Sequence, residues 1–125
     1  MQALLLVGAG GALGAVARYL LALQANRWLG AAWPWGTLIA NVAGSFAMGA
    51  LAAWLTARGG DERWRLLLAV GLLGGFTTFS AYSIEIVQMI ERRAHGPALA
   101  YSLGSVVLSV AALVAGLVLV RRVLT

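Results

Sequence analysis

Two apolar stretches of the chain carry a polar side chain at every fourth residue. The two sets are Thr37, Asn41 and Ser45 in the first stretch, and Tyr101, Ser105 and Ser109 in the second. Residues four apart lie on one face of a helix, so each set forms a polar stripe. Two such stripes predict the walls of a polar track for an ion or a small polar solute. The alternative is that these groups only join helices through hydrogen bonds, which contribute about 0.6–2 kcal/mol each in membranes.

The segment GGFTTFSAYSIE, residues 74–85, mixes glycine, hydroxyl, aromatic and carboxyl groups. Gly71, Gly74 and Gly75 each disfavour a helix by about 1 kcal/mol relative to alanine. The hydroxyls of Thr77 and Thr78 compete with the helix as well, because they hydrogen-bond to nearby backbone groups. We therefore predict a broken helix, whose free carbonyl and N–H groups suit ion binding. The alternative is a kinked helix whose glycines only allow close packing.

The charges near these polar groups bear on the kind of ion. No ring of carboxylates accompanies them, and Glu85 is the only acid well inside a predicted span. Cation pathways commonly carry acidic rings, so the sequence favours an anion or a neutral solute. The rings of Phe79 and Tyr82 have positively polarised edges that suit a small anion. Arg18 either adds positive potential within the first span or extends its guanidinium to the membrane surface.

The composition requires that these segments lie in a membrane. The chain has 125 residues, of which 62% are hydrophobic and 10% charged, and its mean hydropathy is +0.89. Soluble domains are about half apolar and about one-quarter charged, and a chain this small buries too little surface to hide the excess. A membrane-spanning helix needs about 20 apolar residues. We predict one transmembrane domain over residues 1–125, with four spans at residues 3–23, 34–57, 66–90 and 97–120.

The distribution of charge and the absence of cysteine exclude several other kinds of site and partner. The net charge of +5 comes from nine arginines, most of them near predicted helix ends, so we expect lipid headgroups and not nucleic acid as their partners. The absence of cysteine excludes disulfides and thiolate metal sites. The single histidine, His95, is interpreted as a loop residue. The N-terminus lacks the basic segment of a cleavable signal, and its apolar run is long enough to span a membrane.

Arginines and small residues indicate how the spans assemble. Five arginines are predicted on one side of the membrane and three on the other: Arg58, Arg63, Arg65, Arg121 and Arg122 against Arg27, Arg92 and Arg93. Positive residues favour the cytoplasmic side. The small excess is compatible with one fixed orientation, or with insertion both ways and pairing as an inverted dimer. Gly10 and Gly14 form a small-xxx-small pair, which predicts close helix packing.

Taken together, these features resemble the Fluc (CrcB) family of fluoride channels. The resemblance covers nearly the whole chain, through the segments GGALGAVARY, WGTLIANVAGSFAMG, GGFTTFSAYSIE and YSLGSVVLS. It implies an all-α membrane fold of four transmembrane helices with a broken third helix, assembled as an antiparallel, dual-topology homodimer with two fluoride pores. It also implies passive fluoride export across the cytoplasmic (inner) membrane of a prokaryote, by a multi-pass channel and not by an enzyme.

The resemblance also assigns site residues by position. Those expected along a fluoride pore are Thr37, Asn41, Phe79, Ser80, Tyr82, Tyr101, Ser105 and Ser109. The backbone carbonyls of Gly74 and Thr77, from two subunits, are expected to hold a structural sodium ion. Arg18 and Glu85 match family positions that bear on the electrostatics of the pathway.

One short segment departs from the family pattern. The family typically has Phe-Ser-Thr-Phe, whereas residues 79–82 of this chain read Phe-Ser-Ala-Tyr. Tyr82 keeps the ring edge and adds a hydroxyl that needs a partner if it is buried. Ala81 lacks the hydroxyl that the family has at this position. The geometry around the second aromatic ring is therefore expected to differ from that of the family.

Two other classes of function stay open on the sequence alone. A small four-span proton-coupled multidrug exporter needs a carboxylate where substrate and proton compete, and the first two spans contain no Asp or Glu. A protein that only assembles with others would use its polar stripes for helix contacts. Fluoride flux that is independent of a proton gradient would distinguish the channel from both.

Overall fold

The computed structural model describes residues 1–125 and is entirely helical. Its elements in chain order are α1 (Gln2–Leu29), α2 (Trp35–Ala57), α3 (Glu62–Trp64), the π-helical segment η1 (Arg65–Leu73), α4 (Gly74–Phe76), α5 (Phe79–Glu91) and α6 (His95–Leu124). Four segments are long and apolar enough to cross a membrane: α1, α2, Glu62–Glu91 and α6. The prediction of an all-helical, multi-pass membrane protein with four spans is confirmed.

The helices extend beyond the predicted spans. α1 continues to Leu29, so the residues after Leu23 that were predicted as a joint are mostly helical, and it ends at Gly30 with a φ of 82°. The third span begins at Glu62, where the side chain of Asp61 accepts the backbone N–H of Arg63. The apolar run marks where a helix meets lipid, whereas backbone hydrogen bonds and caps decide where the helix ends. The predicted ends at residues 23 and 66 were therefore wrong by several residues.

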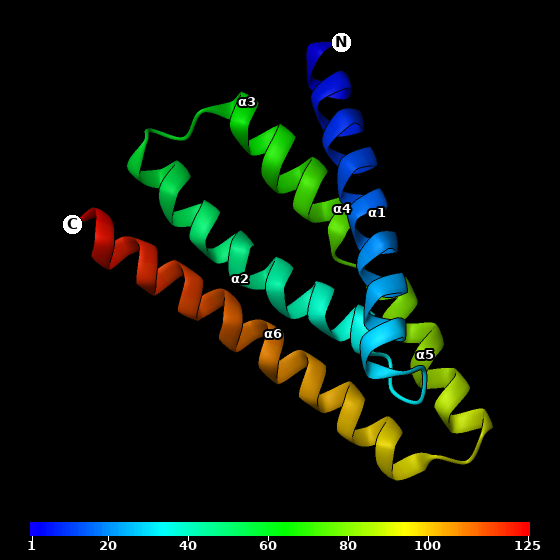
Figure 1. The fold of residues 1–125 in the computed structure, drawn as a ribbon. Coiled ribbons are helices and arrows are strands. Elements are labelled where there is room, and N and C mark those ends of the chain that lie inside the picture. Colours follow the sequence, from blue (N-terminus) through cyan, green and yellow to red (C-terminus); the bar gives the residue numbers. More distant parts are fainter.

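Two pairs of helices form the frame of the molecule (Figure 1). α2 and α6 lie side by side over most of their length. α1 packs against η1 and α4. The contact is so close that a Cβ atom on Gly10 would meet the carbonyl oxygen of Leu67. A Cβ on Gly14 would likewise lie 2.8 Å from the backbone nitrogen of Phe76. The predicted close packing at these two glycines is confirmed.

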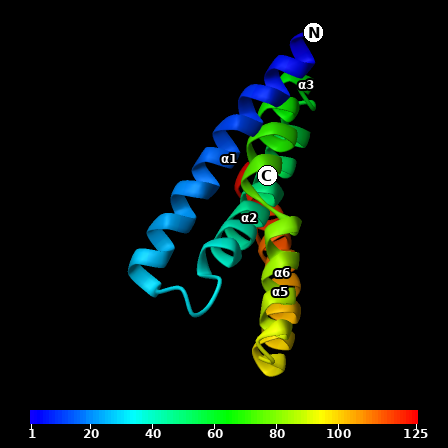
Figure 2. The ribbon, with the colours of Figure 1, turned by 90° about the vertical axis from the view of Figure 1, so that its right-hand side faces the viewer.

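The third span changes its packing partner part-way along its length. Its first part, η1 and α4, packs against α1, whereas α5 packs against α6 (Figures 1 and 2). Between α4 and α5 the backbone is extended, with φ −83° and ψ 154° at Thr77 and φ −150° and ψ 125° at Thr78. The side chain of Thr78 then accepts the N–H of Ala81 as an N-cap and starts α5.

Most side chains of the single chain face outwards, as expected for a protein surrounded by lipid. Only 16 of 125 residues are buried, and the exposed ones include many Leu and Val side chains along the helices. A cluster of buried side chains lies between α5 and α6; its members are Tyr82, Met89, Ala98 and Tyr101. This cluster fixes α5 against α6 and so forms one end of the polar region described below.

Candidate functional site

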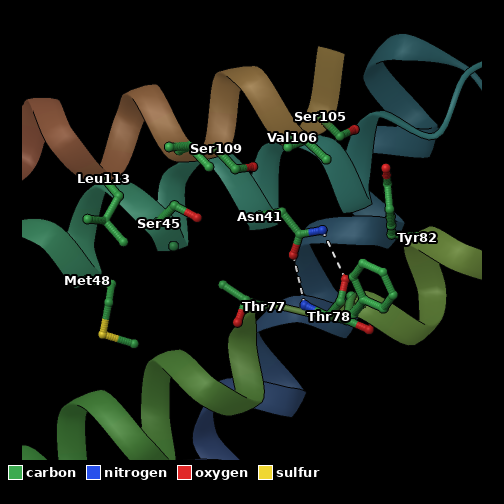
Figure 3. Close-up of a pocket in the computed structure, with 13 residues that line it drawn as sticks. Asn41, Ser45, Met48, Thr77, Thr78, Tyr82, Ser105, Val106, Ser109 and Leu113 are labelled. Atoms are coloured by element: carbon green, nitrogen blue, oxygen red, sulfur yellow. Dashed lines mark hydrogen bonds between the residues drawn. The ribbon is translucent and has the colours of Figure 1, made fainter. Parts of the chain in front are cut away.

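A pocket of about 360 Å³ lies between α2, the extended segment Thr77–Thr78, the start of α5, and α6 (Figure 3). Its lining includes six of the residues predicted for the pore or the sodium site: Asn41, Thr77, Phe79, Tyr82, Ser105 and Ser109. The other lining residues are Gly44, Ser45, Met48, Thr78, Val106, Val110 and Leu113. None of the thirteen side chains carries a charge. An ion in this pocket would be bound by dipoles and not by a counter-charge.

Asn41 joins α2 to the extended segment through both ends of its amide. Its Oδ1 accepts the backbone N–H of Thr78 at 2.8 Å, and its Nδ2 donates to the carbonyl of Thr78 at 2.9 Å (Figure 3). A side chain at membrane depth thus satisfies two backbone groups that a helix would otherwise pair internally. Asn41 was predicted as a pore-lining donor, and in this structure one of its two N–H donors is engaged by the backbone.

Two backbone carbonyls beside the pocket lose their usual helical partners as a result. In a helix the N–H of residue 78 would donate to the carbonyl of Gly74, but it donates to Asn41 instead. The N–H of Ala81 donates to the Thr78 hydroxyl at 3.1 Å and not to the carbonyl of Thr77. The carbonyl oxygens of Gly74 and Thr77 are thereby left available to other partners.

The two aromatic side chains after this segment have very different surroundings. Phe79 is 77% exposed, and its ring centroid lies 5.3 Å from that of the buried Tyr82. The Tyr82 hydroxyl donates to the carbonyl of Ser102 on α6 at 2.7 Å. The hydroxyl that distinguishes this chain from the family pattern therefore has a backbone partner, and it ties α5 to α6.

Thr37 and Tyr101 do not line the pocket, although both were predicted along the pore. They lie one turn from Asn41 and Ser105 on their helices, and both donate to the carboxylate of Glu85. The Thr37 hydroxyl is 2.9 Å from Oε2, and the Tyr101 hydroxyl is 3.1 Å from Oε1. Glu85, Thr37 and Tyr101 form what we call the Glu85 cluster, which draws on α2, α5 and α6.

The remaining predicted residues differ in their surroundings. Ser105 is only 5% exposed, and its hydroxyl has no hydrogen-bond partner within the chain. Ser80 is exposed outside the pocket, with its hydroxyl 3.1 Å from that of Thr78. Arg18 donates through Nε to the carbonyl of Gly75 at 3.4 Å, so its head group lies beside the extended segment. No group of three or more His, Cys, Asp or Glu side chains is placed to hold a metal ion.

Sequence reasoning placed Ser45 on the polar stripe of α2 but did not include Ser45 or Thr78 among the expected pore residues, and both line the pocket. Thr78 is also the partner of Asn41 and the N-cap of α5. Its position directly before a new helix, with its hydroxyl available, is a recognisable N-cap signal. Ser45 belongs to the polar stripe of α2, so its spacing was already the signal.

Comparison with known proteins identifies close relatives over the full chain. A family model described as "CrcB-like protein, Camphor Resistance (CrcB)" matches residues 5–117. A protein of Phenylobacterium zucineum (strain HLK1) named fluoride-specific ion channel FluC is 71% identical over 125 residues, which cover 98% of each chain. Proteins of the same name from Caulobacter sp. (strain K31) and Caulobacter vibrioides (strain NA1000 / CB15N) are 58% and 55% identical, again over 98% of each chain.

Proposed function

The chain belongs to the CrcB family, and from this premise we propose that it is a fluoride-selective channel for passive export across the cytoplasmic membrane of a bacterium. The names of its relatives support fluoride as the ion. The observation that carries the proposal is the uncharged pocket between α2, α5 and α6. Hydroxyl-bearing and aromatic side chains line one small volume there, and such a lining suits a small anion that must leave again.

Within this proposal the pore residues have different roles. Ser105 and Ser109 offer hydroxyls to the ion, and Ser105 offers one that no other group of the chain engages. Phe79 and Tyr82 present ring edges, and Ser80 adds a hydroxyl beside Phe79. Asn41 acts mainly by holding the extended segment in place. Thr37 and Tyr101 continue the track one turn beyond the pocket.

We further propose that two copies assemble as an antiparallel homodimer within lipid. Phe79, a pocket residue, is 77% exposed in the single chain, and a second copy packed against it would close this side of the pocket. The near balance of arginines on the two sides supports insertion in both orientations. Because the chain has no cysteine, a Thr125→Cys variant tests this directly. An impermeant thiol reagent should label about half of the molecules from outside; labelling of all or none contradicts dual topology.

A structural sodium ion at the centre of the dimer is the third part of the proposal. The carbonyl oxygens of Gly74 and Thr77 fit this role, because their helical N–H partners donate elsewhere. Hard cations prefer such oxygen ligands, and the two copies together would supply four. When bound, the ion would hold the two extended segments together. Dimer purified in sodium-free potassium buffer should unfold at a lower temperature and recover when sodium is added; an unchanged temperature counts against the site.

Fluoride efflux from proteoliposomes tests the proposed function. Vesicles loaded with potassium fluoride are diluted into fluoride-free buffer, and valinomycin supplies the compensating potassium current. A channel should release fluoride on addition of valinomycin, without a proton gradient, and should not release chloride. Efflux that requires a proton gradient would favour an exporter, and no efflux would favour a role in assembly alone.

A further inference from the structure

Five aromatic side chains form a continuous row that ends at the pocket. They come from the joint between α1 and α2 (residues 30–34), from α2, from α5 and from α6. In space their order is Trp35, Trp33, Tyr101, Tyr82 and Phe79, and successive ring centroids are 6.2, 5.6, 5.5 and 5.3 Å apart. Aromatic rings attract one another at centroid distances of about 4.5–7 Å, so every step of this aromatic row is a favourable contact. The row therefore links the joint to the ring of Phe79.

Phe79 depends on the aromatic row for its orientation within the chain. Its side chain is 77% exposed, and its aromatic neighbour is Tyr82. A side chain so exposed has little packing of its own to select one rotamer. Tyr82 is buried, and it is held both by its hydrogen bond to the carbonyl of Ser102 and by the ring of Tyr101. The orientation of the exposed ring is thus passed on from the buried ones.

Trp33 is the member of the row that lies outside every helix (Figure 2). Its ring packs edge-on, at an interplanar angle of 86°, against Tyr101, which is only 1% exposed. Nε1 of Trp33 is buried and has no hydrogen-bond partner within the chain. Apolar contacts alone therefore hold this side chain, although an indole usually finds a hydrogen-bond partner when it is buried. Its position at membrane depth is explained by the contact with Tyr101 and not by a polar bond.

We propose that Trp33 is a positioning residue for the pocket, which fixes the ring of Phe79 through Tyr101 and Tyr82 and thereby contributes to the selection of fluoride. The inference rests on the proposed fluoride channel and adds to it a residue outside the pocket. A ring attracts an anion only through its positively polarised edge, so the edge must point at the ion. A Phe79 ring that rotates freely would distinguish fluoride from chloride less well. Trp33 touches no ion in this scheme and acts through two other rings.

The Trp33→Leu variant removes the ring, whereas Trp33→Phe keeps one and loses no hydrogen bond within the chain. The measurement is the ratio of fluoride to chloride efflux from proteoliposomes. We expect this ratio to fall about fivefold in Trp33→Leu, since the contribution of one aromatic pair corresponds to a factor of about two to twelve. In Trp33→Phe it should stay within about twofold. Trp28→Leu is the matched control and should keep the ratio, because Trp28 is 79% exposed near the end of α1 and lies outside the row.

Fluorine NMR in detergent micelles follows the Phe79 ring without reference to conduction. The chain has three phenylalanines, Phe46, Phe76 and Phe79, so labelling with 4-fluorophenylalanine places one probe on each. Loss of one signal in Phe79→Leu identifies that of Phe79. In Trp33→Leu this signal should move or broaden, while the signals of the two rings outside the row stay in place. If Trp33→Leu does not fold, Trp33→Met replaces it, because this long apolar side chain fills irregular gaps without a ring, and the same changes are expected.

The outcomes distinguish the inference from the proposed function. Absence of fluoride efflux from the unmodified protein overturns the channel proposal and, with it, any part of Trp33 in selection. Normal efflux with an unchanged ratio in Trp33→Leu, or a lower ratio with an unchanged Phe79 signal, overturns the role of Trp33 alone. An equal fall of the ratio in Trp33→Phe, or movement of all three fluorine signals together, does so as well, because Trp33 would then only stabilise the fold. A lower ratio and a changed Phe79 signal in Trp33→Leu, with Trp33→Phe and Trp28→Leu like the unmodified protein, support the inference.

Discussion

The amide of Asn41 stabilises the extended segment of the third span through two hydrogen bonds. Replacing Asn41 with an apolar residue of similar size tests this role. The Asn41→Leu variant keeps most of the volume and removes both hydrogen bonds to Thr78, which measure 2.8 and 2.9 Å. It leaves the N–H and the carbonyl of Thr78 without a side-chain partner in a partly buried region. The N–H of Thr78 cannot regain a bond within a helix, because the backbone is extended at Thr77 and Thr78.

The expected loss follows from these two bonds. A protein hydrogen bond contributes about 1 kcal/mol net, and interhelical bonds in membranes average about 0.6 kcal/mol. Two bonds therefore give a lower limit near 1.2 kcal/mol, and the unpaired N–H of Thr78 raises the loss to about 2 kcal/mol. Ser45→Ala is the matched control, since Ser45 lines the same pocket one turn along α2. Its free energy of unfolding should change by less than about 0.5 kcal/mol.

Unfolding in mixed micelles of mild detergent and dodecyl sulfate, followed by the fluorescence of the five tryptophans, measures these differences. Equal protein concentrations are needed, because assembly links stability to concentration. Hydrogen exchange at the Thr78 amide gives a local measurement and should become faster in Asn41→Leu only. This stabilising role of Asn41 is refuted if the free energy of unfolding of Asn41→Leu is within about 0.5 kcal/mol of that of the unmodified protein and the Thr78 amide keeps its protection from exchange.

Three further predictions concern packing and the aromatic residues. Gly14→Ala should lose about 2 kcal/mol or more in a thermal-unfolding assay, because its Cβ would collide with the backbone of η1. Gly8→Ala, with open space around its Cβ, should be neutral or gain up to about 1 kcal/mol, and equal losses in both variants would contradict the close packing. Tyr82→Phe removes the bond to Ser102 and should lower stability by about 1 kcal/mol while efflux stays within about twofold; a much larger loss of efflux would put the hydroxyl on the pathway. Phe79→Ile should abolish fluoride efflux and keep the assembly size in gel filtration, since it removes only a ring edge, and normal efflux would count against that account.

The spans of this protein could be predicted from sequence because each depends on a local property. An apolar run of about 20 residues identifies a membrane helix without knowledge of its neighbours. The small-xxx-small pair Gly10 and Gly14 likewise predicts a close contact from one helix alone. Helix ends depend on capping and on backbone conformation, so the continuation of α1 to Leu29 and the start of the third span at Glu62 were not predicted.

The partners of the polar residues could not be predicted in the same way. Spacing placed Thr37 and Asn41 on one stripe, but their partners belong to other helices. Asn41 bonds to Thr78, and Thr37 bonds to Glu85, 48 residues further along the chain. Such pairs depend on how three helices rotate about their axes and on where the third span becomes extended. The family resemblance supplied positions for the pathway but no donor or acceptor for Glu85.

The hydrogen bonds among the polar groups also bear on how the proposed channel would select fluoride. On the proposed pathway, an anion that accepts hydrogen bonds from Thr37 and Tyr101 must break the bonds that join them to Glu85. The free energy needed to break these bonds is the same for every anion. The free energy gained when the anion accepts hydrogen bonds from the two released hydroxyls is largest for the smallest halide. Fluoride also loses the most hydration, so the donors and ring edges must converge closely enough to replace its water. We therefore infer that these internal bonds form a barrier that fluoride passes more easily than chloride.

The Glu85 carboxylate is therefore expected to affect selectivity. Removal of the Glu85 charge weakens the hydrogen bonds that Thr37 and Tyr101 donate to this side chain. Every anion then displaces the side chain more easily, and the anion that competes least well gains most. The fluoride-over-chloride ratio of efflux should accordingly fall in Glu85→Gln and stay unchanged in Glu91→Gln, the matched control at the exposed end of the same helix. Parallel measurements with fluoride and chloride electrodes on the same vesicles provide the ratio. A ratio that stays constant would mean that selection does not depend on Glu85 and occurs elsewhere, among Ser105, Ser109 and the aromatic rings.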